Sequence, residues 1–202
     1  IVDSLVGSEM CIRDRPTPLT FIRLGTSGTI QANIDLDSLI VAEAAIGFDN
    51  LMHYYEPSMC EHPIAVSLHS KLGMSKNLNH PYYIDGDSVL VDDCLKLGMR
   101  KGIIVTNPGF YAPQGRHLRT KNILPYDLNE FLHFNYKDSI ITNFDMETSG
   151  IYGLSHVMGH RAISISAILA NRFHSTFSNQ ADKTVFNMIE KVTNAIKNGF
   201  FL

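Results

Sequence analysis

Residues 89–106 read VLVDDCLKLGMRKGIIVT, and this stretch decides the fold class. Apolar side chains recur at helical spacing over 89–97, and the apolar run 103–106 follows after Gly98 and Gly102. A helix that leads through glycine into a buried strand is typical of an α/β sheet. The sequence therefore predicts an α/β protein in which the segment after residue 106 leaves the carboxyl end of a strand, where ligands of such sheets bind.

The rest of the chain continues the alternation of strands and helices. Strands are expected at 38–44, 139–142 and 162–170, and helices at 148–159 and 181–197. The last helix is expected to turn one apolar face to the core, formed by Val185, Ile189, Val192 and Ile196. Because the chain has no repeats and no low-complexity stretch, we expect a single domain.

Composition narrows the class of protein. The chain has 202 residues, 45% of them hydrophobic, and no apolar run long enough to span a bilayer. A formal net charge of −3 and the lack of a Lys/Arg block argue against a nucleic-acid surface. Cys60 and Cys94 lack the spacing of a metal or redox site, which indicates free thiols in a reducing compartment. We therefore expect a cytoplasmic protein with neither a nucleic-acid nor a membrane partner.

The loop at 109–116, GFYAPQGR, brings an aromatic ring, a carboxamide and a guanidinium together. A base such as uracil presents carbonyl oxygens beside a ring N–H. Gln114 can both donate and accept at that edge, and Arg116 offers a cation for charge that develops on a departing base. Phe110 is expected to pack against the ring of the base. The alternative is an ordinary solvated turn that contains an arginine.

The segment at 20–28, TFIRLGTSG, is expected to be a short strand that runs into a turn of small residues. Backbone N–H groups around Gly25, the Thr26 hydroxyl and the Arg23 cation could converge there on a phosphate. The alternative is a tight turn without a ligand. Ser27 is not expected to be a nucleophile, because no His–Asp pair accompanies it.

A third cluster, NFDMETSG at 143–150, is expected at a strand-to-helix junction. The Glu147 carboxylate could accept hydrogen bonds from two sugar hydroxyls, and Met146 could lie against the apolar face of a ribose. Alternatively, Glu147 is an acid that complements the helix dipole and Met146 belongs to the core. His156 and His160 stand four residues apart but have no third ligand nearby, so no metal site is expected.

Together these motifs resemble the nucleoside phosphorylase family over a region from about residue 16 to the end of the chain. The ordered elements that carry the resemblance are Arg23-x-Gly-Thr-Ser-Gly, Phe110-Tyr-x-x-Gln-x-Arg, Met146-Glu147 and Asn171-Arg172. The element with Gln114 and Arg116 is similar to the uracil-specific branch, whereas the purine branch usually carries an Asp where this chain has Asn171-Arg172. The resemblance implies a three-layer α/β/α fold with a mixed central sheet.

The resemblance also implies an activity, namely reversible phosphorolysis of uridine to uracil and ribose 1-phosphate. Inorganic phosphate would be a co-substrate, and no organic cofactor or metal would be needed. A homo-oligomer built from dimers that share sites is implied, with a hexamer left open. The implied roles are phosphate binding by Arg23, Gly25 and Thr26, with Arg23 and Thr26 catalytic; ribose binding by Thr26, Met146 and Glu147; and base binding by Phe110, Gln114, Arg116 and Arg172.

Three alternatives to that activity stay open: a broader nucleoside phosphorylase, a nucleosidase that uses water, and a nucleoside-binding relative without turnover. Residues 1–15, IVDSLVGSEMCIRDR, match nothing in the family and resemble a translated sequencing adapter. We therefore expect a non-native leader at 1–15 and a nucleoside phosphorylase domain at 16–202 that corresponds to the C-terminal portion of the family's enzymes. Without the first strands of the family's sheet and its early phosphate loop, this chain alone is expected to be inactive.

Overall fold

The computed structural model describes residues 17–74, 78, 80–116, 119, 129–136 and 139–202, so the leader expected at 1–15 lies outside the described residues. The strands of the described part are β1 (Thr20–Thr29), β2 (Leu39–Gly47), β3 (Tyr82–Asp85), β4 (Arg100–Thr106), β5 (Asn135–Tyr136), β6 (Ser139–Asp145), β7 (Arg161–Asn171) and β8 (Thr176–Phe177). The α-helices are α2 (Pro63–Lys71), α3 (Ser88–Lys96), α4 (Asn129–Leu132), α5 (Thr148–Val157) and α6 (Ala181–Lys197). The 3-10 turns are η1 (Leu51–Tyr54), η2 (Pro57–Glu61) and η3 (Ala112–Gln114).

The central sheet is mixed, with the strand order β3-β2-β4-β6-β1-β7-β8. Three pairs are parallel, namely β1–β7, β2–β4 and β4–β6, whereas β1–β6, β2–β3 and β7–β8 are antiparallel. β2 also pairs antiparallel with β7, so the pairings form a ring through β2, β4, β6, β1 and β7. This ring brings the ends of β1, β6 and β7, which are far apart in sequence, to one side of the molecule.

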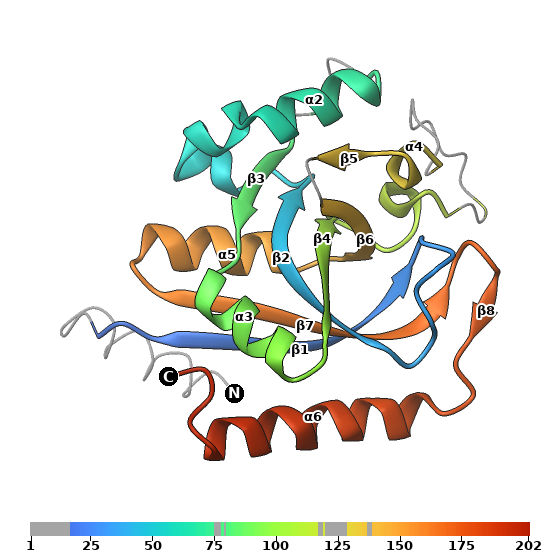
Figure 1. The fold of residues 1–202 in the computed structure, drawn as a ribbon. Helices are drawn as coiled ribbons and strands as arrows, with labels where there is room; N and C mark the ends of the chain where they lie inside the picture. Colours follow the sequence, from blue (N-terminus) through green and yellow to red (C-terminus); the bar gives the residue numbers. More distant parts are fainter. Residues whose placement is uncertain (1–16, 75–77, 79, 117–118, 120–128, 137–138) are drawn as a thin grey trace.

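Helices cover both faces of this sheet (Figure 1). Val41 of β2 packs in one buried cluster with residues of α3, α6 and β7. Its neighbour Ala42 packs in another cluster with Tyr152 of α5. Successive residues of a strand point to opposite faces, so the two clusters define layers on either side of the sheet. A third cluster joins α2 and the segment around α4 to β2, β4 and β6. The expected three-layer α/β/α fold with a mixed sheet is confirmed.

The strand and helix predictions hold closely. The strand predicted at 38–44 is β2, those at 103–106, 139–142 and 162–170 are β4, β6 and β7, and the helices at 89–97 and 148–159 are α3 and α5. The closing helix at 181–197 is α6 with the same bounds. Cys60 and Cys94 are free thiols, as expected. Among the described residues, the helices are too short or too polar to cross a bilayer.

The prediction of a turn after Arg23 is wrong, because the small residues that follow continue the strand. β1 pairs in parallel with β7 from Thr20 to Thr29, and the register shifts once, between Ser27 and Gly28. A backbone with no partner inside a protein is costly, and β7 supplies partners that a turn would forgo. The bulge changes the direction of the chain here without ending the strand.

The buried face of α6 also differs from the expectation. Ile189 and Ile196 are each 45% exposed, whereas the buried positions are Thr184, Met188, Val192 and Ala195. The packed face is shifted by one residue at three of the four expected positions, whereas Val192 is buried as expected. Thr184 can lie on this face because its hydroxyl donates to Asp37 Oδ1 over 2.7 Å. A satisfied hydroxyl can be buried at little cost, so a polar residue replaces an apolar one on the packed face.

Candidate active site

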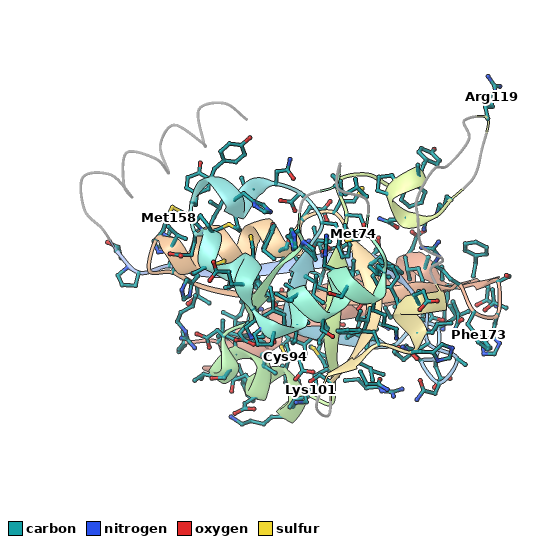
Figure 2. All side chains as sticks on the ribbon, turned by 90° about the horizontal axis from the view of Figure 1, so that it is seen from above. Met74, Cys94, Lys101, Arg119, Met158 and Phe173 are labelled. Atoms are coloured by element: carbon teal, nitrogen blue, oxygen red, sulfur yellow. The ribbon has the colours of Figure 1, made fainter. Side chains whose placement is uncertain are left out.

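A cavity of about 470 Å³ opens where β1, β6 and β7 approach the loop that follows β4. All nine site residues expected from the sequence line it: Arg23, Gly25, Thr26, Phe110, Gln114, Arg116, Met146, Glu147 and Arg172. The β7–β8 turn forms part of the same end of the molecule. Figure 2 shows Phe173, in that turn, at one end and Met158, just beyond α5, at the other. The structure thus assembles in one place residues that the sequence spreads over four segments.

Seven further residues of the cavity were assigned no binding or catalytic role from the sequence. They are Ser27, Gly28, Phe144, Asp145, Leu169, Ala170 and Phe177. Asp145 matters most among them, since it is an acid that is only 5% exposed. Its position directly after an apolar strand run and three residues before a helical Thr was a signal for a buried capping acid.

One end of the cavity, formed by Arg23, Asp145 and Glu147, is a network of one guanidinium and two carboxylates. Arg23 Nη2 donates to Glu147 Oε2, and Arg23 Nη1 lies 3.5 Å from Asp145 Oδ2. Arg23 Nη1 also donates to Ser164 Oγ over 3.3 Å. The guanidinium folds back over Gly25, where a Cβ would lie 2.3 Å from Nη1. Glycine at this position therefore leaves the space that Arg23 occupies.

Asp145 is held by donors on two neighbouring elements. The Thr106 hydroxyl of β4 donates to Oδ1 over 2.7 Å, and the Thr148 backbone N–H donates to Oδ2 over 3.1 Å. The Thr148 hydroxyl donates to Oδ2 as well. Burial raises the pKa of Asp145 above its ordinary value, while these hydroxyls act in the opposite direction. Asp145 caps the first turn of α5.

Because Asp145 caps α5, the alternative interpretations of its two neighbours can be judged. Glu147 stands at the N-cap position of α5, but its side chain makes no capping hydrogen bond and is 47% exposed. Met146 is 46% exposed and does not belong to the core. Both side chains instead face the cavity, where they are accessible to a ligand.

The other end of the cavity carries two guanidinium groups and one amide. Arg116 Nη1 donates to Gln114 Oε1 over 2.5 Å and to the Phe110 backbone oxygen over 2.6 Å. Arg172 Nη2 donates to the Gln114 backbone oxygen over 2.7 Å. Gln114 is only 3% exposed, and its Oε1 is occupied by Arg116. Its amide nitrogen is therefore the group left to donate to a ligand.

Phe110, which is expected to pack against a base, also contacts an arginine. The Arg116 guanidinium carbon lies 3.7 Å from the centre of the Phe110 ring, so the ring supports the arginine. Phe110 also contacts Tyr111 edge-to-face, with ring centres 5.3 Å apart. Arg116 covers one face of the ring, and the contact of Phe110 with a bound base stays a prediction.

The two arginines at this second end have no carboxylate partner among the described residues. Among the ion pairs of the described residues, none includes Arg116 or Arg172. Arg172 Nη1 is buried without a hydrogen-bond partner. Burial lowers the pKa of Arg116, and burial together with Arg116 lowers that of Arg172 to about 10. Both arginines remain cationic at neutral pH, so this end can stabilise a ligand that carries or develops negative charge.

Other places in the described chain are weaker candidates for a functional site. A larger cavity of about 650 Å³ lies beneath α6, at the amino ends of β2 and β4. Its acid Asp37 already accepts hydrogen bonds from Ser178, Gln180 and Thr184. The described residues contain no cluster of three or more potential metal ligands. His160 lies beyond the end of α5, and its Nδ1 accepts from the Leu19 backbone N–H over 3.3 Å.

Comparison with known proteins gives a consistent result at the sequence level. The sequence model of the Phosphorylase superfamily matches residues 9–198. The uridine phosphorylase of Thermococcus kodakarensis is 29% identical over 166 residues, which are 81% of this chain and 53% of that protein. The uridine phosphorylase of Haemophilus influenzae is 24% identical over 182 residues, which are 88% of this chain and 63% of that protein. The chain thus spans between half and two thirds of the length of these relatives.

Solved structures resemble this fold. A Trypanosoma brucei nucleoside phosphorylase, described as showing uridine phosphorylase activity, aligns with a TM-score of 0.75 at 22% identity and covers 89% of this chain and 64% of its own. Uridine phosphorylase from Schistosoma mansoni aligns with a TM-score of 0.63 at 19% identity and covers 98% of this chain and 67% of its own. At these identities the likeness establishes the fold.

Proposed function

This chain belongs to the Phosphorylase superfamily, and from that premise we propose that its cavity carries out the reversible phosphorolysis of uridine to uracil and ribose 1-phosphate. The single observation that carries the proposal is the polarity of the cavity. At one end lie the guanidinium groups of Arg116 and Arg172, for which the described part of the chain supplies no carboxylate partner, and a guanidinium with two carboxylates lies at the other. A nucleoside has a matching polarity, with a base that departs as an anion and a sugar rich in hydroxyl donors.

At the base end, catalysis follows from charge development. As the glycosidic bond stretches, negative charge grows on uracil and spreads over its ring nitrogen and carbonyl oxygens. The free donors of Arg116, Arg172 and Gln114 then interact more strongly with the transition state than with uridine. A departing purine would gain from an acid that protonates its imidazole nitrogen, and the described base end offers none.

At the sugar end, Glu147 accepts hydrogen bonds from ribose hydroxyls and Met146 lies against the sugar ring. Phosphate binds to Arg23, Thr26 and the backbone at Gly25, and attacks C1′ from the face opposite the base. Arg23 compensates part of the charge of the phosphate, which is the nucleophile and a co-substrate. This chemistry calls for no organic cofactor. Cytoplasmic location and a dimer-based homo-oligomer remain predictions.

A second candidate, hydrolysis by a nucleosidase, is favoured by one observation. Arg23 already faces two carboxylates, so the described part of this end holds one cation against two acids. Such a balance suits a neutral water better than a multiply charged phosphate. Phosphate dependence separates the two reactions, because hydrolysis gives free ribose at any phosphate concentration.

The test is uracil release from uridine, measured over a series of phosphate concentrations, by the chain extended at its amino end to the full length of the relatives, because the 202-residue chain alone is expected to be inactive. We expect release that rises with phosphate and saturates, with ribose 1-phosphate as the second product and inosine cleaved far more slowly. The reverse reaction, from uracil and ribose 1-phosphate, should release phosphate. Release that is independent of phosphate would favour the nucleosidase, and no release by the extended protein at saturating phosphate would contradict both activities.

A further inference from the structure

The ion pair between Arg23 and Glu147 joins two groups that the proposed reaction assigns to different substrates. We propose that this pair is a latch that a tetrahedral dianion opens: the anion takes Arg23 from Glu147, and the released carboxylate then binds the ribose hydroxyls. The inference rests on the proposed function and adds that the binding of the two substrates is positively coupled. Phosphate and nucleoside should each tighten the binding of the other.

The resting state has the two substrate-binding groups occupied by each other. Arg23 Nη2 donates to Glu147 Oε2, and the same Oε2 accepts from the Met146 backbone N–H over 3.4 Å. While this pair is closed, the carboxylate has less capacity to accept hydrogen bonds from a sugar. The guanidinium is likewise partly neutralised toward an anion. Phosphate must therefore compete with Glu147 for Arg23, and the nucleoside must compete with Arg23 for Glu147. Binding of either substrate removes this competition for the other.

Of the two acids beside Arg23, Glu147 is the exchangeable one. Its side chain is 47% exposed, and an ion pair open to water contributes little, about 0–1 kcal/mol. Asp145, whose side chain is 1% exposed, is tied by the donors of Thr106 and Thr148 and cannot leave without abandoning them. Asp145 therefore keeps Arg23 in the cavity when Glu147 is released.

The surroundings of Arg23 allow the exchange without a backbone movement. Gly25 leaves open the space over which the guanidinium lies, and Ser164 Oγ keeps an acceptor on Nη1. Arginine has five N–H donors, so Nη1 of Arg23 can stay with Asp145 and Ser164 while Nη2 turns from Glu147 to an anion. Because the coupling is a free-energy difference between two binding events, it must be reciprocal.

The first experiment measures binding of inorganic phosphate alone to the 202-residue chain by calorimetry. Wild type is compared with Glu147→Gln, with Glu147→Ala, and with Glu190→Gln as a control that removes the same charge from an exposed position on α6. Both Glu147 variants should bind phosphate about two- to five-fold more tightly, since the competing acid is gone. Glu190→Gln should not change the affinity. Thermal melting checks that all variants are folded.

The second experiment measures the Kd of uridine with and without sulfate, a tetrahedral dianion that is a poor nucleophile, against sodium chloride at equal ionic strength. In the wild type, sulfate should tighten uridine binding at least two-fold, and uridine should tighten sulfate binding by the same factor. In Glu147→Ala this coupling should vanish. Weaker or unchanged phosphate binding in both Glu147 variants would overturn the latch, as would independent binding of uridine and sulfate in the wild type.

These outcomes are distinct from failure of the proposed function. Phosphate-dependent turnover together with independent binding would overturn the latch and leave the phosphorolysis assignment intact. A chain that binds neither phosphate nor uridine would overturn both.

Discussion

The guanidinium of Arg116 lies 3.7 Å over the ring of Phe110, and both residues come from one short loop after β4. The same loop carries Gln114, whose Oε1 accepts from Arg116. The ring thus positions the Arg116 guanidinium in the cavity. A positioning role for Phe110 differs from direct contact with the base and can be tested separately.

Phe110→Leu should reduce kcat/KM for uridine by roughly two- to thirty-fold, because a cation–π contact contributes about 0.5–2 kcal/mol. Stability should change little, since Phe110 is half exposed. Tyr111→Leu is the matched control: this ring is also exposed and in the loop but does not line the cavity. Equal losses in the two variants would indicate general loosening of the loop and contradict the positioning role.

Arg116→Ala and Gln114→Ala should each weaken use of uridine by about 1.5–3 kcal/mol in transition-state terms, the cost of a lost hydrogen bond to a charged group. The loss should fall mainly on kcat for Arg116, whose charge matters most as uracil departs. Steady-state kinetics over a range of uridine concentrations gives both parameters. Unchanged kcat/KM in both variants would remove the base-binding assignment.

Two changes of the same chemical kind, Glu147→Gln and Asp145→Asn, should affect different properties. The first should lower turnover and the second should lower stability. Glu147→Gln should lower turnover by about 10- to 150-fold with stability nearly unchanged, because the carboxylate is expected to bind the ribose and its half-exposed ion pair with Arg23 adds little to stability. Asp145→Asn should lower the free energy of unfolding by about 1–3 kcal/mol, since an amide cannot accept from Thr106 and Thr148 alike. Urea denaturation and uracil release measure the two effects. A stability loss in Glu147→Gln with normal turnover would favour the helix-dipole interpretation.

Asp37 should make the free energy of unfolding depend on pH, because it accepts hydrogen bonds from Ser178 and from Thr184 of α6. The hydrogen bond from Ser178, followed by that from Thr184, lowers the pKa of Asp37, so the carboxylate is stabilised in the folded state. A lowered pKa contributes stability above the unfolded-state pKa of about 4, and this stability is lost as pH falls through the folded-state value.

Asp37→Asn should therefore lower the free energy of unfolding by about 1 kcal/mol at pH 7, a value reduced for exposure to solvent, and by less as the pH drops below about 4. Urea titrations at several pH values measure the difference. Asp35→Asn, an exposed acid in the same loop, is the control. A difference between wild type and Asp37→Asn that is constant with pH would contradict the assignment.

Several features of this protein were predictable because their signals are local. The apolar spacing over 181–197 predicts α6 with its bounds, and the run 103–106 predicts the core of β4. The residues from Phe110 to Arg116 lie within seven positions, so their chemistry could be interpreted before their geometry was known. Patterns of this kind depend on neighbours along the chain, and a sequence contains them completely.

What the sequence left open depends on partners that are distant in the chain. Whether the small residues after Arg23 turn or continue as a strand depends on the pairing with β7, and the burial of Thr184 on α6 depends on Asp37, which accepts from its hydroxyl. Arg23 and Glu147 are 124 residues apart, and Arg172 and Gln114 are 58 apart. By itself the sequence determined the strands and helices that it predicted, the family motifs and the residue types of the site, whereas α2 and β3 were not predicted. Only the tertiary structure decided that Asp145 holds Arg23 and caps α5, because hydrogen bonds and burial arise from the packing of separate strands and leave no periodic signal in any one of them.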